Sequence, residues 1–308
     1  MLWANKIAEE LIETYPNEET FVCAAGVTPS GDISLNSLRE AVITDIIRQA
    51  LELKGKQAKT LFSWDDYDLF RREPDELSTP FSEYNNLPYS EIPDPEGCHA
   101  TYVEHFESAF ESVLSNLNIH PTYIYQHEKY LSGEYTADIR EALKKRREIY
   151  DIIAPMKNRF FSESDRESYY PVHIYCRSCG KETMEKVTYH EVGDYIEYTC
   201  ACGYREFAAL EGFNHMKLIW EVDWAMRWRH EGVTFEPGGP EHSAEFGSYQ
   251  ISSAIADQIF GIRPPYYLPY ASVSSDSAFS LSDESSRKEA LSKMATADPS
   301  EGIHIAIK

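Results

Sequence analysis

Four of the six cysteines are spaced as ligands of a single metal ion. They lie within YCRSCGKETMEKVTYHEVGDYIEYTCACGY, as Cys176, Cys179, Cys200 and Cys202. Each pair is followed by a glycine, Gly180 or Gly203, which suits the tight turn of a metal-binding knuckle. Two knuckles joined by β-rich sequence place four thiolates around one tetrahedral Zn²⁺. The spacing predicts a structural zinc ribbon at residues 173–206, with disulfides as the alternative in an oxidising compartment.

The remaining cysteines, Cys23 and Cys98, stand alone in the sequence. Cys23 falls in an apolar stretch and is expected to be a small core residue. His190 lies between the two cysteine pairs as a spare ligand, but four sulfurs already complete the coordination shell of zinc. The sequence therefore predicts one zinc ion per chain.

Polar side chains follow two apolar stretches that read as neighbouring strands. The first stretch leads into Gly26 and Thr28, and the second ends at Asp65 and Asp66. Ligands of parallel sheets bind beyond the carboxyl ends of the strands, so these residues are candidates for a binding site. For Asp65 and Asp66 two interpretations stay open, contact with an amino group or ribose of a ligand, or capping of a following helix.

The elements that would carry these residues alternate in type. An amino-terminal helix is expected, then a strand at 20–25, a helix from Ser37 to Leu53 and a strand at 59–64. This β-α-β pattern predicts a parallel sheet with a right-handed crossover. Later helices are expected at 99–117, 134–153, 217–232 and 248–261, with a strand near 233–239 and a last strand near 266–273.

Composition and charge narrow the class of protein. A chain of 308 residues with 42% hydrophobic residues can bury a large core. No apolar run approaches the roughly 20 residues that span a bilayer, and the acidic amino-terminal helix is unlike a signal peptide, which together predict a cytoplasmic protein without membrane contact. The formal net charge of −22 opposes binding to RNA or DNA. The basic run KKRR at 144–147 is expected to be a solvated face near a helix end, with an RNA-binding patch as the alternative.

Several longer stretches carry a resemblance to a known family. In chain order they are GVTPSG, LREAVITD, FSWDDYD, PDPEGCHATYVEHF, the four-cysteine segment, KLIWEVDWAMRW, FEPGGPEHS, GSYQIS and PPYYLPY. In these stretches the chain resembles the catalytic region of a class I lysyl-tRNA synthetase. The resemblance implies an α/β fold with a Rossmann-like doubly wound parallel sheet, split by an inserted connective region that carries the zinc ribbon. The catalytic halves would be residues 1–120 and 213–308 around an insertion at 121–212, and the family's anticodon-binding domain is expected to be absent.

Both nucleotide-binding signatures of that family are replaced in this chain. The first, H-I-G-H or H-I-G-N, falls on Ser34, Leu35, Asn36 and Ser37. The second, K-M-S-S-S-K, falls on Ser280, Leu281, Ser282, Asp283, Glu284 and Ser285. The resemblance gives the histidines and lysines contacts with ATP phosphates, and gives the glycine a bare surface against adenine. Losing three or more charge-assisted donors removes roughly 4–9 kcal/mol, or about three to six decades in rate, so ordinary use of ATP is expected to be lost.

The amino-acid pocket implied by the resemblance is largely retained. Its matching positions are Gly26, Thr28, Trp224, His242 and Tyr249. Aromatic faces and oxygen acceptors suit the ammonium group of lysine. Trp220, Trp224 and Trp228 also have the spacing of a helical core stripe, which is the favoured interpretation of Trp220 and Trp228. The family's W-R-x-D-W-P has Glu221 and Ala225 here in place of arginine and proline, so the expected ligand is lysine or a related amino acid.

Three functions are compatible with these residues. The first is a synthetase-like protein that binds a lysine-like amino acid without ATP chemistry and docks with a partner protein. The second is an enzyme that activates an amino acid for transfer to an acceptor other than tRNA. The third is a lysine–tRNA ligase whose remaining parts lie on another chain. The first predicts no lysine-dependent ATP–pyrophosphate exchange, and the net charge predicts weak or absent tRNA binding.

Overall fold

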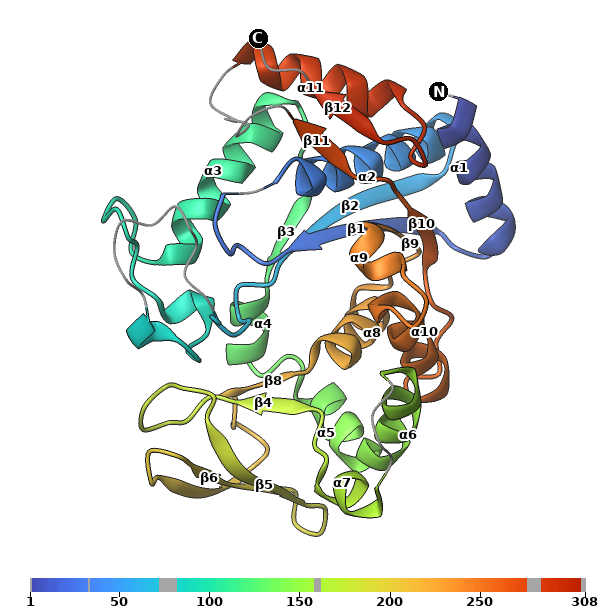
Figure 1. Cartoon of the computed structure of the whole chain (residues 1–308). Helices are drawn as coiled ribbons and strands as arrows, with labels where there is room; N and C mark the ends of the chain where they lie inside the picture. The colour runs from blue at the N-terminus through green and yellow to red at the C-terminus, as the bar shows by residue number, and fades with distance from the viewer. Residues whose placement is uncertain (1, 33, 72–81, 158–161, 276–283, 306–308) are drawn as a thin grey trace.

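A five-stranded parallel sheet forms the centre of the molecule (Figure 1). The computed structural model describes residues 2–32, 34–71, 82–157, 162–275 and 284–305. The strands are β1 (Thr20–Val27), β2 (Gln57–Trp64), β3 (Thr122–Tyr125), β9 (Phe235–Gly238) and β10 (Tyr266–Pro269). Their order is β10-β9-β1-β2-β3, and every neighbouring pair is parallel. The chain thus starts in the centre and winds outward in both directions, which confirms the predicted Rossmann-like doubly wound sheet.

Successive residues of β1 serve two separate cores. Phe21, Cys23 and Ala25 pack into the core on one face, together with α1 (Leu2–Thr14), α2 (Leu35–Leu53) and α3 (Tyr102–Asn116). Val22 and Ala24 pack into the core on the other face, which includes α8 (Trp220–Glu231) and α10 (Ser248–Gln258). A strand covered on both faces must be apolar throughout, which is the pattern that the sequence shows. Cys23 is fully buried, as expected of a small core residue.

The chain between β3 and α8 forms an insertion, which lies below the sheet in Figure 1. It begins with four helices, α4 (Gln126–Leu131), α5 (Thr136–Lys144), α6 (Arg146–Met156) and α7 (Glu163–Ser168). Two antiparallel sheets follow, one pairing β4 (Val172–Ile174) with β8 (Met216–Leu218), the other joining β5 (Met184–His190), β6 (Tyr195–Cys200) and β7 (Arg205–Ala209). The four spaced cysteines follow β4 or lie at the end of β6 and just beyond it.

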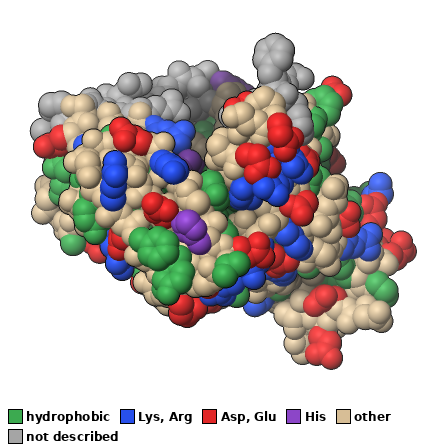
Figure 2. Space-filling view, turned by 90° about the horizontal axis from the view of Figure 1, so that it is seen from below, with side chains coloured by type: hydrophobic (Ala, Val, Ile, Leu, Met, Phe, Trp, Pro, Cys, Tyr) green, Lys and Arg blue, Asp and Glu red, His purple; other side chains and the backbone are tan. Residues whose placement is uncertain are grey.

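The basic run at 144–147 lies at a junction between helices. The single helix expected at 134–153 is wrong, because α5 ends at Lys144 and α6 begins at Arg146. Lys145 Nζ donates to Ile259 O at 2.5 Å, and Arg146 donates to the carbonyls of Arg166, Glu167 and Tyr169. Lys145 thus binds the carboxyl end of α10 (Ser248–Gln258), and Arg146 binds backbone carbonyls at the end of α7. On the face seen in Figure 2, Lys and Arg side chains are interspersed with Asp and Glu rather than gathered into one basic patch.

A short β-α-β unit follows β10 and packs on α2 (Figure 1). It consists of β11 (Val273–Ser275), α11 (Glu284–Thr296) and β12 (Ile303–Ile305), with β11 parallel to β12. The expectation that the strand near 266–273 is the last one was therefore wrong, because three-residue strands are too short to produce a periodic pattern. None of the described helices is long and apolar enough to cross a membrane.

Candidate functional site

The crevice between β1 and β9 is the point where the strand order reverses, which is where doubly wound sheets bind ligands. Gly26 lies at the carboxyl end of β1, and its N–H donates to Glu40 Oε1 at 3.3 Å. A Cβ at Gly26 would approach Ser63 O on β2 to 2.8 Å, so the close strand contact requires glycine. On the other side of the crevice, β9 ends in Gly238 and leads into α9 (Pro240–Ser243).

Three of the predicted pocket residues meet in one aromatic cluster beside this crevice. The ring centroid of Trp224 lies 5.3 Å from that of His242 and 6.2 Å from that of Tyr249. Tyr249 stacks on Tyr267 with centroids 3.8 Å apart and planes inclined by 13°. Burial lowers the pKa of His242, and its Nδ1 lies 2.8 Å from Ser248 Oγ, so the imidazole is neutral at physiological pH. The cluster offers aromatic faces and no positive charge of its own.

The three tryptophans of α8 form one row of rings in contact, in which Trp220 and Trp224 are stacked and Trp224 and Trp228 are tilted. Trp220 lies on Trp224 at 5.0 Å and 20°, and Trp224 lies 5.0 Å from Trp228. Trp228 is buried and its Nε1–H donates to Glu236 Oε2 at 2.6 Å. Trp220 is half-buried. The central ring, Trp224, therefore belongs both to the core and to the aromatic cluster.

Two acidic residues that the sequence analysis did not single out, Glu40 and Glu236, face the same crevice. Burial raises the pKa of Glu40 to about 8; the Tyr270 hydroxyl, which donates to Glu40 at 2.8 Å, acts against this shift, and the nearby charge of Glu236 contributes to it. Burial likewise raises the pKa of Glu236 to about 7. Neither carboxyl forms an ion pair within the described chain. A carboxylate within the apolar strand VTFEPGG is the signal that could have pointed to Glu236.

Thr28 belongs to a buried ionic network beside the crevice. Its Oγ1–H donates to Asp68 Oδ2 at 3.0 Å. Lys217 Nζ lies 2.8 Å from Asp68 Oδ1 and 2.7 Å from Asp223 Oδ2. The buried ammonium group of Lys217 therefore has two carboxylate partners, which hold its side chain in place. Thr28 is thus joined to this network through Asp68.

The adjoining residues Asp65 and Asp66 are both engaged within the protein. Asp65 Oδ1 accepts from Arg227 at 2.6 Å, and Arg227 also donates to Asp223 at 2.7 Å. Asp66 Oδ1 accepts from the backbone N–H of His127 at 2.7 Å, and Asp66 Oδ2 contacts the His127 ring. His127 lies in the first turn of α4, so Asp66 has the geometry of a helix cap.

A cavity of about 550 Å³ lies between the sheet and the insertion, beside Lys217 and Trp220. Glu221, which stands where the family commonly has arginine, lines this cavity and pairs with Lys157 at 2.5 Å. The paired charges hold α8 against the insertion at this wall.

The residues at the first nucleotide signature are used to join elements. Ser34 is the N-cap of α2, and its Oγ accepts from Ser37 N–H at 3.2 Å. Leu35 is buried, and Asn36 Oδ1 accepts from Val273 N–H at 2.7 Å. Between Gly26 and Glu40 the sequence has a single cation, Arg39, which is buried. Its guanidinium donates to the carbonyls of Ala271, Asp298, Pro299 and Glu301.

Most of the second signature lies outside the described residues. Ser280 and Asp283 fall outside the described residues, and Glu284 and Ser285 begin α11. Lys293 and Met294, which resemble a displaced part of the signature, lie on α11, and Met294 is buried.

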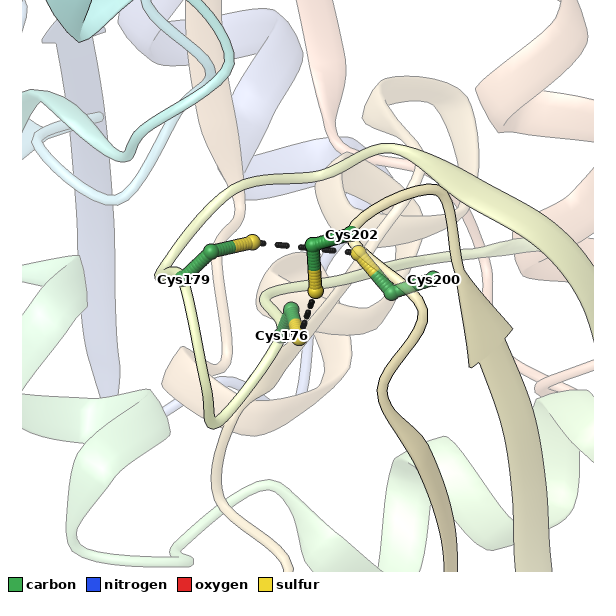
Figure 3. A group of neighbouring side chains, drawn as sticks. All are labelled: Cys176, Cys179, Cys200 and Cys202. Atoms are coloured by element: carbon green, nitrogen blue, oxygen red, sulfur yellow. Dashed lines mark hydrogen bonds between the residues drawn. The ribbon is translucent and has the colours of Figure 1, made fainter.

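The four spaced cysteines converge beyond the ends of β4 and β6 (Figure 3). Cys176 Sγ lies 3.8 Å from Cys202 Sγ, and Cys179 Sγ lies 3.7 Å from Cys200 Sγ. All four cysteines are free thiols. Neighbouring sulfurs of a tetrahedral site with Zn–S bonds of about 2.3 Å are about 3.8 Å apart, so the cluster fits a metal ion of this kind.

Comparison with known proteins gives one consistent result. The sequence profile of the family described as tRNA synthetases class I (K) matches residues 1–301. Lysine–tRNA ligases of Thermococcus kodakarensis, Archaeoglobus fulgidus and Treponema pallidum are 39%, 38% and 35% identical over 269, 270 and 274 residues. The alignments cover 87%, 88% and 87% of this chain and 51%, 53% and 51% of those relatives, so the chain spans about half their length. The resemblance seen in the sequence is confirmed, and the chain belongs to the class I lysyl-tRNA synthetase family.

Proposed function

We propose that this protein binds lysine or a closely related amino acid in the crevice between β1 and β9, and that it does not activate the amino acid with ATP in the ordinary way. The observation that carries the proposal is the contrast between the two sides of the crevice. The amino-acid side has acidic and aromatic residues ready for an ammonium group. On the nucleotide side, the position of the family's glycine carries Asn36, whose side chain is fixed to Val273.

The amino-acid side supports recognition of a positive charge. Glu40 and Glu236 have no cationic partner in an ion pair of the described chain, and burial holds their pKa values near 8 and 7. A ligand ammonium would offset this burial cost by favouring the ionised carboxylates. Trp224, Tyr249 and Tyr267 add aromatic faces that attract the same cation. Gly26 leaves its backbone free of a side chain beside Glu40.

The nucleotide side supports the loss of ordinary ATP chemistry. Ser34 and Asn36 replace a proton-donating histidine and a bare glycine surface of the family, and both now serve neighbouring backbone groups. Arg39 is committed to four carbonyls and does not point to a phosphate site. The catalytic donors of class I synthetases stabilise charge on the phosphates, so their removal lowers the rate steeply.

Adenylate formation is the second candidate function, because the relatives named above are lysine–tRNA ligases. In that case the protein would pass activated lysine to tRNA or to another acceptor, and the phosphate donors would come from residues outside the first signature. The net charge of −22 and the internal contacts of Lys145 and Arg146 favour weak tRNA binding by this chain.

We also assign a structural role to zinc at Cys176, Cys179, Cys200 and Cys202. Four thiolates are a preferred ligand set of structural Zn²⁺ and leave no open position for a substrate. A zinc ion there would cross-link the turn after β4 to the end of β6, which belong to two different sheets.

Two measurements test the proposal separately. Calorimetry should show binding of lysine and ornithine, which have a side-chain ammonium group, and no binding of glutamate, which has a side-chain carboxylate. Glu40→Gln with Glu236→Gln should weaken lysine binding at least tenfold, whereas Glu245→Gln, at an exposed position nearby, should leave it unchanged. Lysine-dependent ATP–pyrophosphate exchange should stay at background; robust exchange would establish the adenylate-forming alternative, and absent lysine binding would remove the first half of the proposal.

A further inference from the structure

The charged side chains around the crevice between β1 and β9 are mostly acidic. Carboxyl groups adjoin the crevice from α2, β9, α9 and α8 and from the segment after β2, and they belong to Glu40, Glu236, Glu241, Asp223, Asp65 and Asp68. The cations packed among them are Lys217 and Arg227. A ligand that enters this crevice therefore meets a negative potential, and its own charge affects how tightly it binds.

The cations of this group are already paired with carboxylates. Lys217 Nζ lies 2.8 Å from Asp68 Oδ1 and 2.7 Å from Asp223 Oδ2. Arg227 Nη1 lies 2.6 Å from Asp65 Oδ1, and its Nη2 lies 2.7 Å from Asp223 Oδ2. Three carboxylates thus share two cations, which leaves one negative charge in excess within the network. Neither cation has positive charge to spare for a carboxylate of a ligand.

Glu40 and Glu236 have neutral hydrogen-bond donors and no cation. Glu40 accepts the N–H of Gly26 at 3.3 Å and the hydroxyl of Tyr270 at 2.8 Å, and Glu236 accepts the indole N–H of Trp228 at 2.6 Å. Burial without a compensating positive charge raises their pKa values to about 8 and about 7. Each carboxyl therefore gains from a positive group that a ligand brings into the crevice.

A carboxylate of a ligand would find no unpaired cation among the described residues of the crevice. Arg39, next to Glu40 in the chain, donates to four backbone carbonyls. His242 is neutral at physiological pH, because burial lowers its pKa. The sequence has no lysine or arginine at 26–38 or at 271–286, so the segments that follow β1 and β10 bring none to the crevice.

The hydroxyl donors of the aromatic cluster are also engaged within the protein. Tyr249 donates its hydroxyl proton to the Pro265 carbonyl at 3.2 Å. Ser243 donates to the Gly239 carbonyl at 2.8 Å, which leaves the Ser243 oxygen to accept from the Tyr267 hydroxyl at 2.7 Å. The cluster therefore presents ring faces and oxygen lone pairs, which suit ammonium and methylene groups and repel a carboxylate.

We propose that the crevice prefers amines with two ammonium groups and no free carboxylate, the chemistry shared by 1,5-diaminopentane and by lysine whose carboxyl group is blocked as an amide. The inference rests on the proposed function, because it assigns the ligand class of the same crevice. Free lysine carries the same two ammonium groups and in addition a carboxylate, which the excess of acidic groups opposes. Glu40 and Glu236 are the groups that each gain from a ligand ammonium.

Calorimetry of the unchanged protein with a series of amines tests the inference. The series consists of lysine, lysinamide, 1,5-diaminopentane and 1-aminopentane, which has a single ammonium group. We expect lysinamide and 1,5-diaminopentane to bind at least tenfold more tightly than lysine, and 1,5-diaminopentane at least tenfold more tightly than 1-aminopentane. Lysine that binds as tightly as both diamines would overturn the inference and leave the proposed function standing. If none of the amines binds, both the inference and the proposed function are wrong.

Variants show whether the two carboxyls recognise the second ammonium group. Glu40→Gln and Glu236→Gln should each lower the ratio of the affinities for 1,5-diaminopentane and 1-aminopentane at least threefold, because each removes one of the charges that the diamine offsets. Glu245→Gln, at an exposed position, should retain the ratio of the unchanged protein. A ratio that neither crevice variant lowers would overturn the inference, since the second ammonium would then bind elsewhere. The amine series on the unchanged protein decides the question even if these variants do not fold.

Discussion

Asn36 on α2 is joined to Val273 on β11 by a hydrogen bond of 2.7 Å from the Val273 N–H to Asn36 Oδ1. The Tyr270 hydroxyl adds a contact to the Asn36 carbonyl at 3.4 Å. The side chain that stands in place of the family's glycine therefore links α2 to the carboxy-terminal β-α-β unit. Arg39, one turn further along α2, strengthens the same link through its four carbonyl contacts.

Replacing this link should destabilise the protein. Asn36→Gly leaves the N–H of Val273, a buried residue, without its acceptor and adds backbone freedom to α2, so we expect a loss of roughly 1–3 kcal/mol in the free energy of unfolding. Asn36→Asp retains the acceptor oxygen and should cost much less. Urea unfolding followed by circular dichroism measures the stability of both variants. Equal stability of Asn36→Gly and the unchanged protein would show that the hydrogen bond does not contribute to the free energy of unfolding.

Restoring the family's signatures should restore affinity for ATP. The change combines Ser34→His and Asn36→Gly with Ser280→Lys and Ser285→Lys, which returns the donors and the bare surface. We expect measurable ATP binding by calorimetry where the unchanged protein shows little, because each charge-assisted contact contributes roughly 1.5–3 kcal/mol. Lysine affinity should change less than twofold, since Trp224, His242 and Tyr249 are untouched. If ATP affinity does not rise, the loss of the site has further structural causes.

The stability of the protein should fall as the pH rises toward 8. Burial raises the folded-state pKa of Glu40 to about 8 and that of Glu236 to about 7, above the roughly 4.3 of an unfolded chain. Carboxyls with raised pKa values stabilise the folded state relative to the unfolded state at low pH, and this contribution is lost progressively as the pH rises from about 4.3 through the folded-state values.

Variants isolate this effect from other titrations. The double change Glu40→Gln and Glu236→Gln should flatten the decline in unfolding free energy between pH 5 and 8.5, with a difference on the order of 5 kcal/mol at the upper end. The Glu245→Gln control should follow the unchanged protein. A double variant whose stability runs parallel to the unchanged protein at every pH would mean that these carboxyls ionise as freely in the folded state as in the unfolded one. Saturating lysine should also reduce the decline, since it favours the ionised carboxylates.

The cysteine ribbon should depend on its metal for local order. Cys200→Ser removes one of four converging sulfurs, so we expect loss of one zinc ion and at least tenfold faster proteolysis within residues 180–210. Ser178→Ala, at an exposed position in the same knuckle, should change neither quantity. Proteolysis followed by mass spectrometry gives the cleavage sites. An intact ribbon in the metal-free Cys200→Ser protein would show that the small sheets fold without zinc.

The sequence by itself determined the features that depend on local patterns. The apolar stretches around a single helix predict β1, α2 and β2 and their parallel pairing, because strand and crossover geometry follow from short-range periodicity. The C-x2-C and C-x-C pairs predict that the four cysteines come together. Within each pair one turn brings the two sulfurs close, so a single contact between the two turns completes the site. Long matching stretches also identify the family, as the comparisons confirm.

Only the tertiary structure decided which distant residues share a site. Glu40 and Glu236 are separated by 196 positions in the chain, and nothing in either segment indicates that both face one crevice. The sequence around Asp65 and Asp66 does not indicate that these carboxylates contact Arg227 and His127. Cys98 Sγ lies next to His105 Nδ1 because the loop between them is closed by the pairing of Pro93 with Thr101. Such contacts depend on how elements pack around two cores, and packing is set by the whole chain rather than by the few residues that form the site.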